Sequence, residues 1–330
     1  MKCYIITKGV EMLNRLVVAL ASAVSGTLGL AGVALAEVPR VAVDVAPVHS
    51  LVARVMQGLG TPALVVRSGA SPHGYAMRPS EAAALEQADL VIWVGEALAP
   101  WLEGSIENLA GTARVVELLG REETHVLDLR EGVAFGVAGE DESGHEPAGH
   151  DHGGHDHEGL DPHAWLDPEN ARRWLGLVAG ELAALDPEHA AHYAANAATA
   201  QAELDALMAE IKAELAPIKD ARFLVYHDAY QYFEAWSGLA ASGAIALGDA
   251  ANPGPARVTA LRDMARAEDI ACVFSEPQFD PKLVESVFGD VAGHGVLDPM
   301  AGAYAPGPDL YPDLMRDMAR ALVDCLGAHR

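Results

Sequence analysis

Short runs rich in β-branched residues alternate with helical stretches along most of this chain, and this alternation constrains the fold more than any other feature. Strands that alternate with helices at this spacing form βαβ units and parallel sheets. The strand candidates are RVAVDVA (40–46), PALVVRSG (62–69), DLVIWVG (89–95) and ARVVELL (113–119), then RFLVY (222–226), ASGAIAL (241–247), IACVFSE (270–276) and GVLD (295–298). We therefore expect an α/β protein with two parallel-sheet lobes.

A helical segment separates the two blocks of strands. It opens with Asp167 as an N-terminal cap and Pro168 in the first helical position, and Asp186 and Pro187 repeat this start signal. The second helix continues to Pro217 without a breaker, so it should measure about 45 Å at 1.5 Å per residue. We expect a rigid helical link (167–217) between an N-terminal lobe (37–166) and a C-terminal lobe (218–330).

Residues 1–36 have the pattern of a secretory signal peptide. Lys2, Lys8 and Arg15 precede an apolar run, 16–36, that ends in the small residues ALA. An uncleaved membrane anchor is the alternative, because the run is nearly long enough for a bilayer of about 30 Å. The A-x-A ending, with Ser, Thr and Gly inside the run, favours cleavage near Ala36, so we expect an exported protein.

The net charge of −25 at pH 7 limits the choice of partners. Nucleic acids and anionic lipids are polyanions that this charge would repel, so general binding to either is excluded. A cationic ligand suits this charge.

Export also bears on the cysteines. Cys3 lies in the segment to be removed, which leaves Cys272 and Cys325 as an even pair in an oxidising compartment. We expect a disulfide worth about 4 kcal/mol on the chain-entropy model. Two buried free thiols are the alternative.

Four candidate metal ligands stand beside strand ends or a helix start. His73, His227 and Asp298 each follow a strand candidate, where parallel sheets place ligand groups, and His163 precedes the helix capped by Asp167. Three imidazoles and a carboxylate suit a tetrahedral zinc site in a cleft between the lobes. Spacing alone does not show that these side chains meet.

A polar, Gly-rich insert at 139–159 carries five further histidines. Because ordering each residue of a flexible loop costs about 1–2 kcal/mol, such ligands bind metal weakly. We expect an accessory metal-binding loop and keep an inert polar linker as the alternative. Its histidines are His145, His150, His152, His155 and His157.

Five motifs resemble the zinc-uptake solute-binding proteins of bacterial ABC importers, the ZnuA-like group within metal-binding cluster A-I. They are GASPHGYAMRPSEAAALEQADLVIWVG (69–95), DPHAWLDPENAR (161–172), YHDAYQYF (226–233), CVFSEPQF (272–279) and LDPM (297–300). The resemblance covers essentially the whole chain beyond residue 36. It implies two α/β lobes joined by a long helix, little hinge motion and one metal ion in the cleft between the lobes. It also implies a monomeric periplasmic protein without enzymatic activity that delivers Zn²⁺ to an inner-membrane ABC permease with its cytoplasmic ATPase.

The resemblance also assigns residues. By position in the motifs, His73, His163 and His227 look like the family's three zinc-binding histidines, and Cys272 and Cys325 match its disulfide pair. Some zinc-binding members have an acidic residue directly before the first histidine, where this chain has Pro72. The fourth ligand is therefore either Asp298 or a water molecule, and we expect Asp298. Three imidazoles favour zinc over manganese, which prefers oxygen ligands.

Other polar residues flank the expected ligands. Tyr75, Arg78, Trp165 and Asp228 are candidates for orienting them, and Glu276 is expected to be a structural or cleft-facing group.

Two other functions compete with zinc delivery. A secreted zinc hydrolase would need an open coordination position and a general base, and no recognisable base motif is present. A free-standing periplasmic zinc buffer would dock to no transporter.

Overall fold

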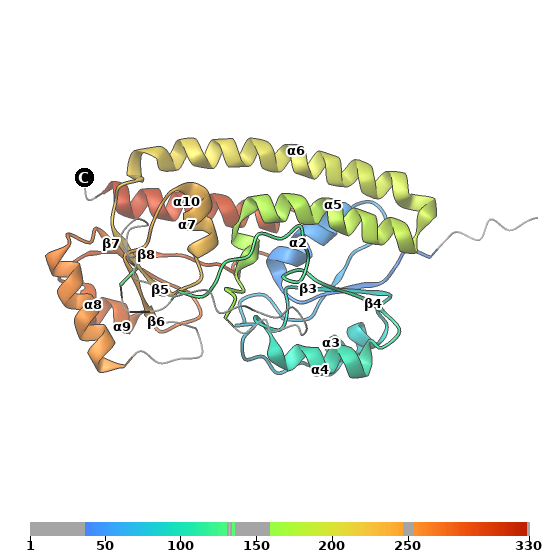
Figure 1. The fold of residues 1–330 in the computed structure, drawn as a ribbon, viewed down its shortest axis with the longest axis horizontal. Helices are drawn as coiled ribbons and strands as arrows, with labels where there is room; N and C mark the ends of the chain where they lie inside the picture. The colour runs from blue at the N-terminus through green and yellow to red at the C-terminus, as the bar shows by residue number, and fades with distance from the viewer. Residues whose placement is uncertain (1–36, 131, 133, 136–158, 247–253, 329–330) are drawn as a thin grey trace, which may run out of the picture. The chain divides into compact units, whose positions relative to one another are not determined.

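The structure, a computed structural model, describes residues 37–130, 132, 134–135, 159–246 and 254–328. All elements described below lie within Val38–Arg330, one of the two units into which the chain divides (Figure 1). The expected signal peptide and the five insert histidines lie outside the described residues. No helix in the described ranges has the length and apolar character that crossing a membrane requires.

The first lobe is built on a parallel sheet of four strands in the order β2-β1-β3-β4. The strands are β1 (Val41–Val43), β2 (Ala63–Leu64), β3 (Leu90–Trp93) and β4 (Arg114–Glu117), and the helices between them are α2 (Ala46–Val55), α3 (Pro79–Glu86) and α4 (Pro100–Leu109). Both central strands, β1 and β3, are completely buried, as their continuous apolar sequences require of a sheet covered on both faces.

The second lobe repeats this plan with the order β6-β5-β7-β8, again all parallel. Its strands are β5 (Phe223–His227), β6 (Gly243–Ala246), β7 (Cys272–Ser275) and β8 (Gly293–Val296), and its helices are α7 (Gln231–Ser237), α8 (Pro255–Ala267) and α9 (Lys282–Phe288). The prediction of two parallel-sheet α/β lobes joined by a long helix is confirmed.

Two long helices join the lobes. In α5 (Pro168–Leu185) the Asp167 carboxylate caps the first turn by accepting from Glu169 N at 2.9 Å, as expected from the sequence. The linking helix α6 (Ala190–Leu215) has 26 residues, about 39 Å. It begins three residues later than predicted, because Pro187–His189 forms a 3₁₀ turn whose start is held by Asp186. Figure 1 shows α6 running along α5 and along α10 (Leu310–Gly327).

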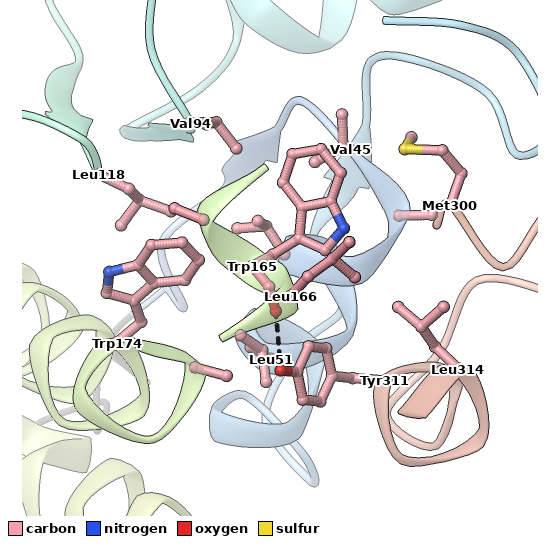
Figure 2. Close-up of a cluster of buried hydrophobic side chains, with 14 of the residues drawn as sticks. Val45, Leu51, Val94, Leu118, Trp165, Leu166, Trp174, Met300, Tyr311 and Leu314 are labelled. Carbon is pink, nitrogen blue, oxygen red and sulfur yellow. Dashed lines mark hydrogen bonds between the residues drawn. The ribbon is translucent and has the colours of Figure 1, made fainter. Parts of the chain in front are cut away.

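One continuous hydrophobic core extends from the first sheet through α5 and α6 to the inner side of the second lobe. Tyr311, at the start of α10, connects the lobes inside this core. Its hydroxyl donates to Trp165 O at 2.8 Å (Figure 2). Its backbone N donates to Ser50 Oγ at 2.9 Å. A second, smaller cluster lies between the second sheet, α8 and α9. Because the lobes share buried side chains, separating them would expose apolar surface.

A disulfide links Cys272 at the start of β7 to Cys325 near the end of α10. The predicted disulfide is confirmed, and it attaches the last helix to the middle of the second sheet.

The chain segment before the insert crosses from the first lobe to the second. Phe135 N donates to Ser242 O at 2.9 Å, next to an antiparallel bridge between Ala134 and Gly243 at the β6 edge. On the return, Leu129 N donates to Gly159 O at 2.7 Å, and Asp161 N donates to Leu127 O at 2.8 Å. These bonds fix Gly159 and Asp161, which lie at the end of the insert and just before His163 in the chain.

Candidate metal centre

Three of the four predicted ligands converge. His73 lies in the connection from β2 to α3, His163 precedes the 3₁₀ turn Ala164–Leu166, and His227 is the last residue of β5. One ring nitrogen of each lies within 4.8 Å of the others. The ring centroid of His163 lies 5.5 Å from that of His73 and 5.2 Å from that of His227. The three imidazoles therefore form one cluster with contributions from both lobes.

Glu276 holds the ring of His227. Strands β5 and β7 pair with Phe223 opposite Cys272, and continuing this register by four residues brings Glu276 beside His227. The Glu276 carboxylate lies 2.6 Å from His227 Nδ1, and both side chains are buried. An ionised carboxylate only accepts, so a neutral His227 ring facing it carries its proton on Nδ1 and keeps the lone pair of Nε2.

Asp161 does the same for His163. Its Oδ1 lies 2.8 Å from His163 Nδ1 and also accepts from His163 N at 3.0 Å, so a two-residue turn fixes the ring. Burial raises the pKa of Asp161 to about 7, while the backbone N–H of His163 and the Arg130 guanidinium favour the charged form. A cation bound between the imidazoles would also favour the ionised carboxylate.

In these orientations, the Nε2 atoms of His163 and His227 face each other at a distance of 3.4 Å. When both carboxylates are ionised and both imidazoles are neutral, the Nδ1 atoms donate, both Nε2 atoms carry lone pairs, and neither Nε2 can donate to the other. Two facing lone pairs in a buried site repel unless a cation or a proton lies between them. Tetrahedral zinc with Zn–N bonds of about 2.0–2.1 Å separates its nitrogen ligands by about 3.3 Å, which matches this spacing.

The loop that carries His73 is held by aromatic side chains of the first lobe. Trp101, on α4, donates from Nε1 to Pro72 O at 2.8 Å. The Tyr75 ring packs against Trp101 with centroids 5.8 Å apart, and its hydroxyl donates to Glu81 Oε1 at 2.8 Å. His73 itself is half-buried, so it forms the more accessible side of the cluster.

A small cavity surrounds the three rings. Its lining combines the histidines with parts of both lobes: Ser71, Pro72, His73, His163, Trp165, His227, Glu276, Gln278, Phe279, Pro299 and Met300. The three rings therefore share one small cavity with residues of both lobes.

The structure does not bring Asp298 into the histidine cluster. Its Oδ1 accepts from Met300 N at 3.0 Å and from Gln278 Nε2 at 3.2 Å, and its Oδ2 accepts from Gly302 N at 2.7 Å. This carboxylate is thus engaged with its own loop and with Gln278.

The other flanking residues divide into two groups. Trp165 and Glu276 line the cavity, and the Trp165 ring lies 5.3 Å from that of His163. Asp228 instead forms an ion pair with Arg130, and Arg78 starts α3, where its N donates to Glu81 Oε2 at 2.6 Å. Tyr75 supports the loop that carries His73, through Trp101 and Glu81, rather than orienting a histidine ring.

Sequence reasoning missed Asp161 and Gln278 and did not assign Glu276 to His227. The two-residue spacing in DPH (161–163) could have indicated Asp161, because a carboxylate there reaches the histidine two positions on. Gln278 carries no comparable signal.

Known proteins resemble this chain over almost its whole length. A family described as "Zinc-uptake complex component A periplasmic" matches residues 41–325. The high-affinity zinc uptake system protein ZnuA of Paracoccus denitrificans (strain Pd 1222) is 43% identical over 316 residues, which cover 92% of this chain and 97% of that protein. The protein of the same name from Brucella abortus (strain 2308) is 43% identical over 317 residues, covering 90% and 95%. In fold, the chain is similar to a solved structure titled "Crystal structure of ZnuA", with a TM-score of 0.70, 22% identity and coverage of 88% and 99%.

Proposed function

The chain belongs to the zinc-uptake complex component A family, and from this we propose that it is a periplasmic, high-affinity zinc-binding protein that delivers Zn²⁺ to an ABC importer. His73, His163 and His227 bind the ion between the lobes. Zinc is the cargo of the protein and takes part in no reaction there.

The facing Nε2 atoms of His163 and His227 carry this proposal. Their separation of 3.4 Å suits two ligands of one tetrahedral ion. Each ring is held by a buried carboxylate, so binding the ion costs little further conformational entropy. Such preorganisation favours high affinity.

The donor set supports zinc as the cargo. Imidazole suits zinc, whereas manganese and magnesium prefer carboxylate, carbonyl and water oxygens. The nearest carboxylates, Asp161 and Glu276, already accept from Nδ1 atoms of the cluster. They add negative charge close to the ion without binding it.

A zinc hydrolase receives less support. The sequence carries no recognisable motif for a general base. A general base must also be free to take a proton from the attacking water, and the two buried carboxylates at the rings are committed to orienting them. We therefore assign no catalytic activity.

The assembly and location follow from the family. We propose that residues 1–36 direct export and are removed near Ala36, and that the mature protein acts as a monomer in the periplasm. Its partners are an inner-membrane permease and the cytoplasmic ATPase of that importer. The histidines of the insert serve as an accessory, weaker metal-binding loop.

Calorimetry on the mature protein tests the proposal. Zinc should bind at one tight site, with additional weaker binding from the insert, and Mn²⁺ should not displace it. Deleting the gene should impair growth when zinc is scarce. Normal growth of the deletion strain would favour the free-standing buffer, and hydrolysis of model esters or peptides by the zinc form would favour an enzyme.

A further inference from the structure

Gln278 has an unusual position at the edge of the metal cavity. Its side chain lines the cavity together with His73, His163 and His227. The amide nitrogen donates to Asp298 Oδ1 at 3.2 Å. The amide oxygen, Oε1, is buried and has no hydrogen-bond partner among the described residues. A buried acceptor without a donor is unfavourable, so a donor from outside the protein is expected there.

Asp298 fixes which end of this amide faces the carboxylate. Its two oxygens already accept from the backbone N–H groups of Met300 and Gly302. An ionised carboxylate only accepts, so the Gln278 side chain must present its NH₂ group to Asp298. The carbonyl end is then directed away from Asp298.

We infer that Gln278 recognises the fourth zinc ligand as a water molecule, whose O–H group donates to Oε1, and that Asp298 acts through Gln278 as a positioning residue. The inference rests on the proposed function and specifies its fourth ligand. Zinc polarises a bound water and makes it a stronger donor. Gln278 lines the same cavity as the three histidines, so its side chain is within the surroundings of the bound ion.

This arrangement also selects among ligands for the fourth position. A carboxylate, an azide or a halide brings lone pairs without a proton and would be repelled by Oε1. Water brings the proton that Oε1 requires. Gln278 should therefore keep the fourth position neutral and exclude anions from the bound ion.

Two substitutions of Gln278 with opposite expected effects test the inference in the full mature protein. Gln278→Met keeps the size of the side chain and removes the acceptor, while Gln278→Glu keeps an acceptor and adds charge. Gln201→Met, on α6, is the matched control, because its amide donates to Arg172 O and neither residue lines the cavity. Zinc affinity is measured by competition with a chelator, and the fourth position is read from the visible absorption of the Co²⁺ form titrated with azide.

In Gln278→Met, zinc affinity should fall about fivefold, as expected for one lost hydrogen bond, and azide should bind the Co²⁺ form several times more tightly than in the parent. In Gln278→Glu, azide should be excluded at least as strongly as in the parent. A merely structural disturbance would move both variants in the same direction. Gln201→Met should match the parent in both measurements.

Parental zinc affinity and parental azide binding in Gln278→Met would overturn the inference. The inference would also be overturned if Asp298→Asn changed the Co²⁺ spectrum and lowered zinc affinity more than a hundredfold while Gln278→Met stayed parental. Asp298 would then be the fourth ligand. A parent protein without a tight zinc site would instead refute the proposed function itself.

Discussion

His163 and His227 come from different lobes, and their Nε2 atoms face each other at 3.4 Å with a buried carboxylate behind each ring. Residues 64 positions apart in the chain are thus held at the spacing of two ligands of one tetrahedral ion. Because the lobes share one core and the Tyr311 bonds to Trp165 and Ser50, this geometry should change little on binding.

The three histidines should be individually necessary for tight binding. Replacing His73, His163 or His227 with Ala removes one nitrogen ligand, and zinc affinity should fall by more than about 100-fold, since disturbing only the orienting groups typically costs 10–100-fold. Chelator competition measures this. His192→Ala is the control, because His192 lies on α6 and its Nε2 contacts Gln57 O. Parental affinity in any of the three variants would remove that residue from the site.

The Glu276 carboxylate should raise zinc affinity by orienting His227, without binding the ion itself. Gln at position 276 can donate to Nδ1 and so allow the proton to move to Nε2, which would block the metal-binding nitrogen. Glu276→Gln should therefore lower zinc affinity about 10–100-fold while thermal unfolding of the metal-free form changes little. Glu285→Gln, on the exposed side of α9, should leave affinity unchanged. Equal affinities for both variants would contradict an orienting role for Glu276.

The disulfide should stabilise the second lobe. Thiol titration of the denatured, unreduced mature protein should find no free sulfhydryl. Replacing Cys272 and Cys325 together by Ala opens a loop closed over 53 residues and should lower the free energy of unfolding by about 4 kcal/mol. Denaturant unfolding of the double variant measures this value. Two titratable thiols in the parent would argue against the bond.

Gly302 should be needed for the contact between the loops of the two lobes. A Cβ added there would lie 2.8 Å from Gly69 Cα, in the loop that leads to His73. Gly302→Ala should push these loops apart and lower both zinc affinity and thermal stability. Gly307→Ala is a matched control in the same connection, where an added Cβ meets nothing within 4 Å. If Gly302→Ala and Gly307→Ala have equal zinc affinity and thermal stability, the close approach of Gly302 to Gly69 is not needed for zinc binding.

The insert should contribute extra zinc binding without forming the tight site. Deleting 139–158 removes its five histidines but keeps Gly159, whose carbonyl oxygen accepts from Leu129 N and holds the chain before Asp161. The deleted protein should fold, bind one zinc instead of several, and keep the affinity of the tight site. Calorimetry on both forms distinguishes this from the reverse result, in which the tight step disappears and the weak ones remain.

Much of the fold is visible in the sequence because its signals are local. The alternation of apolar strands and helices, the Asp167 cap with Pro168, and the even pair Cys272 and Cys325 each depend on residues close in the chain or on simple counting, and the structure agrees with all three. His73 and His227 were likewise indicated by their positions after strands, since parallel sheets bring such ends to one edge.

The partners of these histidines were decided only by the tertiary structure. Glu276 reaches His227 through the β5–β7 register, and Asp298 turns to Gly302 and Gln278 instead of the cluster because its loop folds around its own carboxylate. Such contacts join residues distant in sequence and depend on side-chain direction, which no periodicity encodes. The sequence by itself therefore determined which residue types were available for zinc and near which strand ends they lie. The packing of two lobes around one core decided which histidines meet and which carboxylates contact their rings.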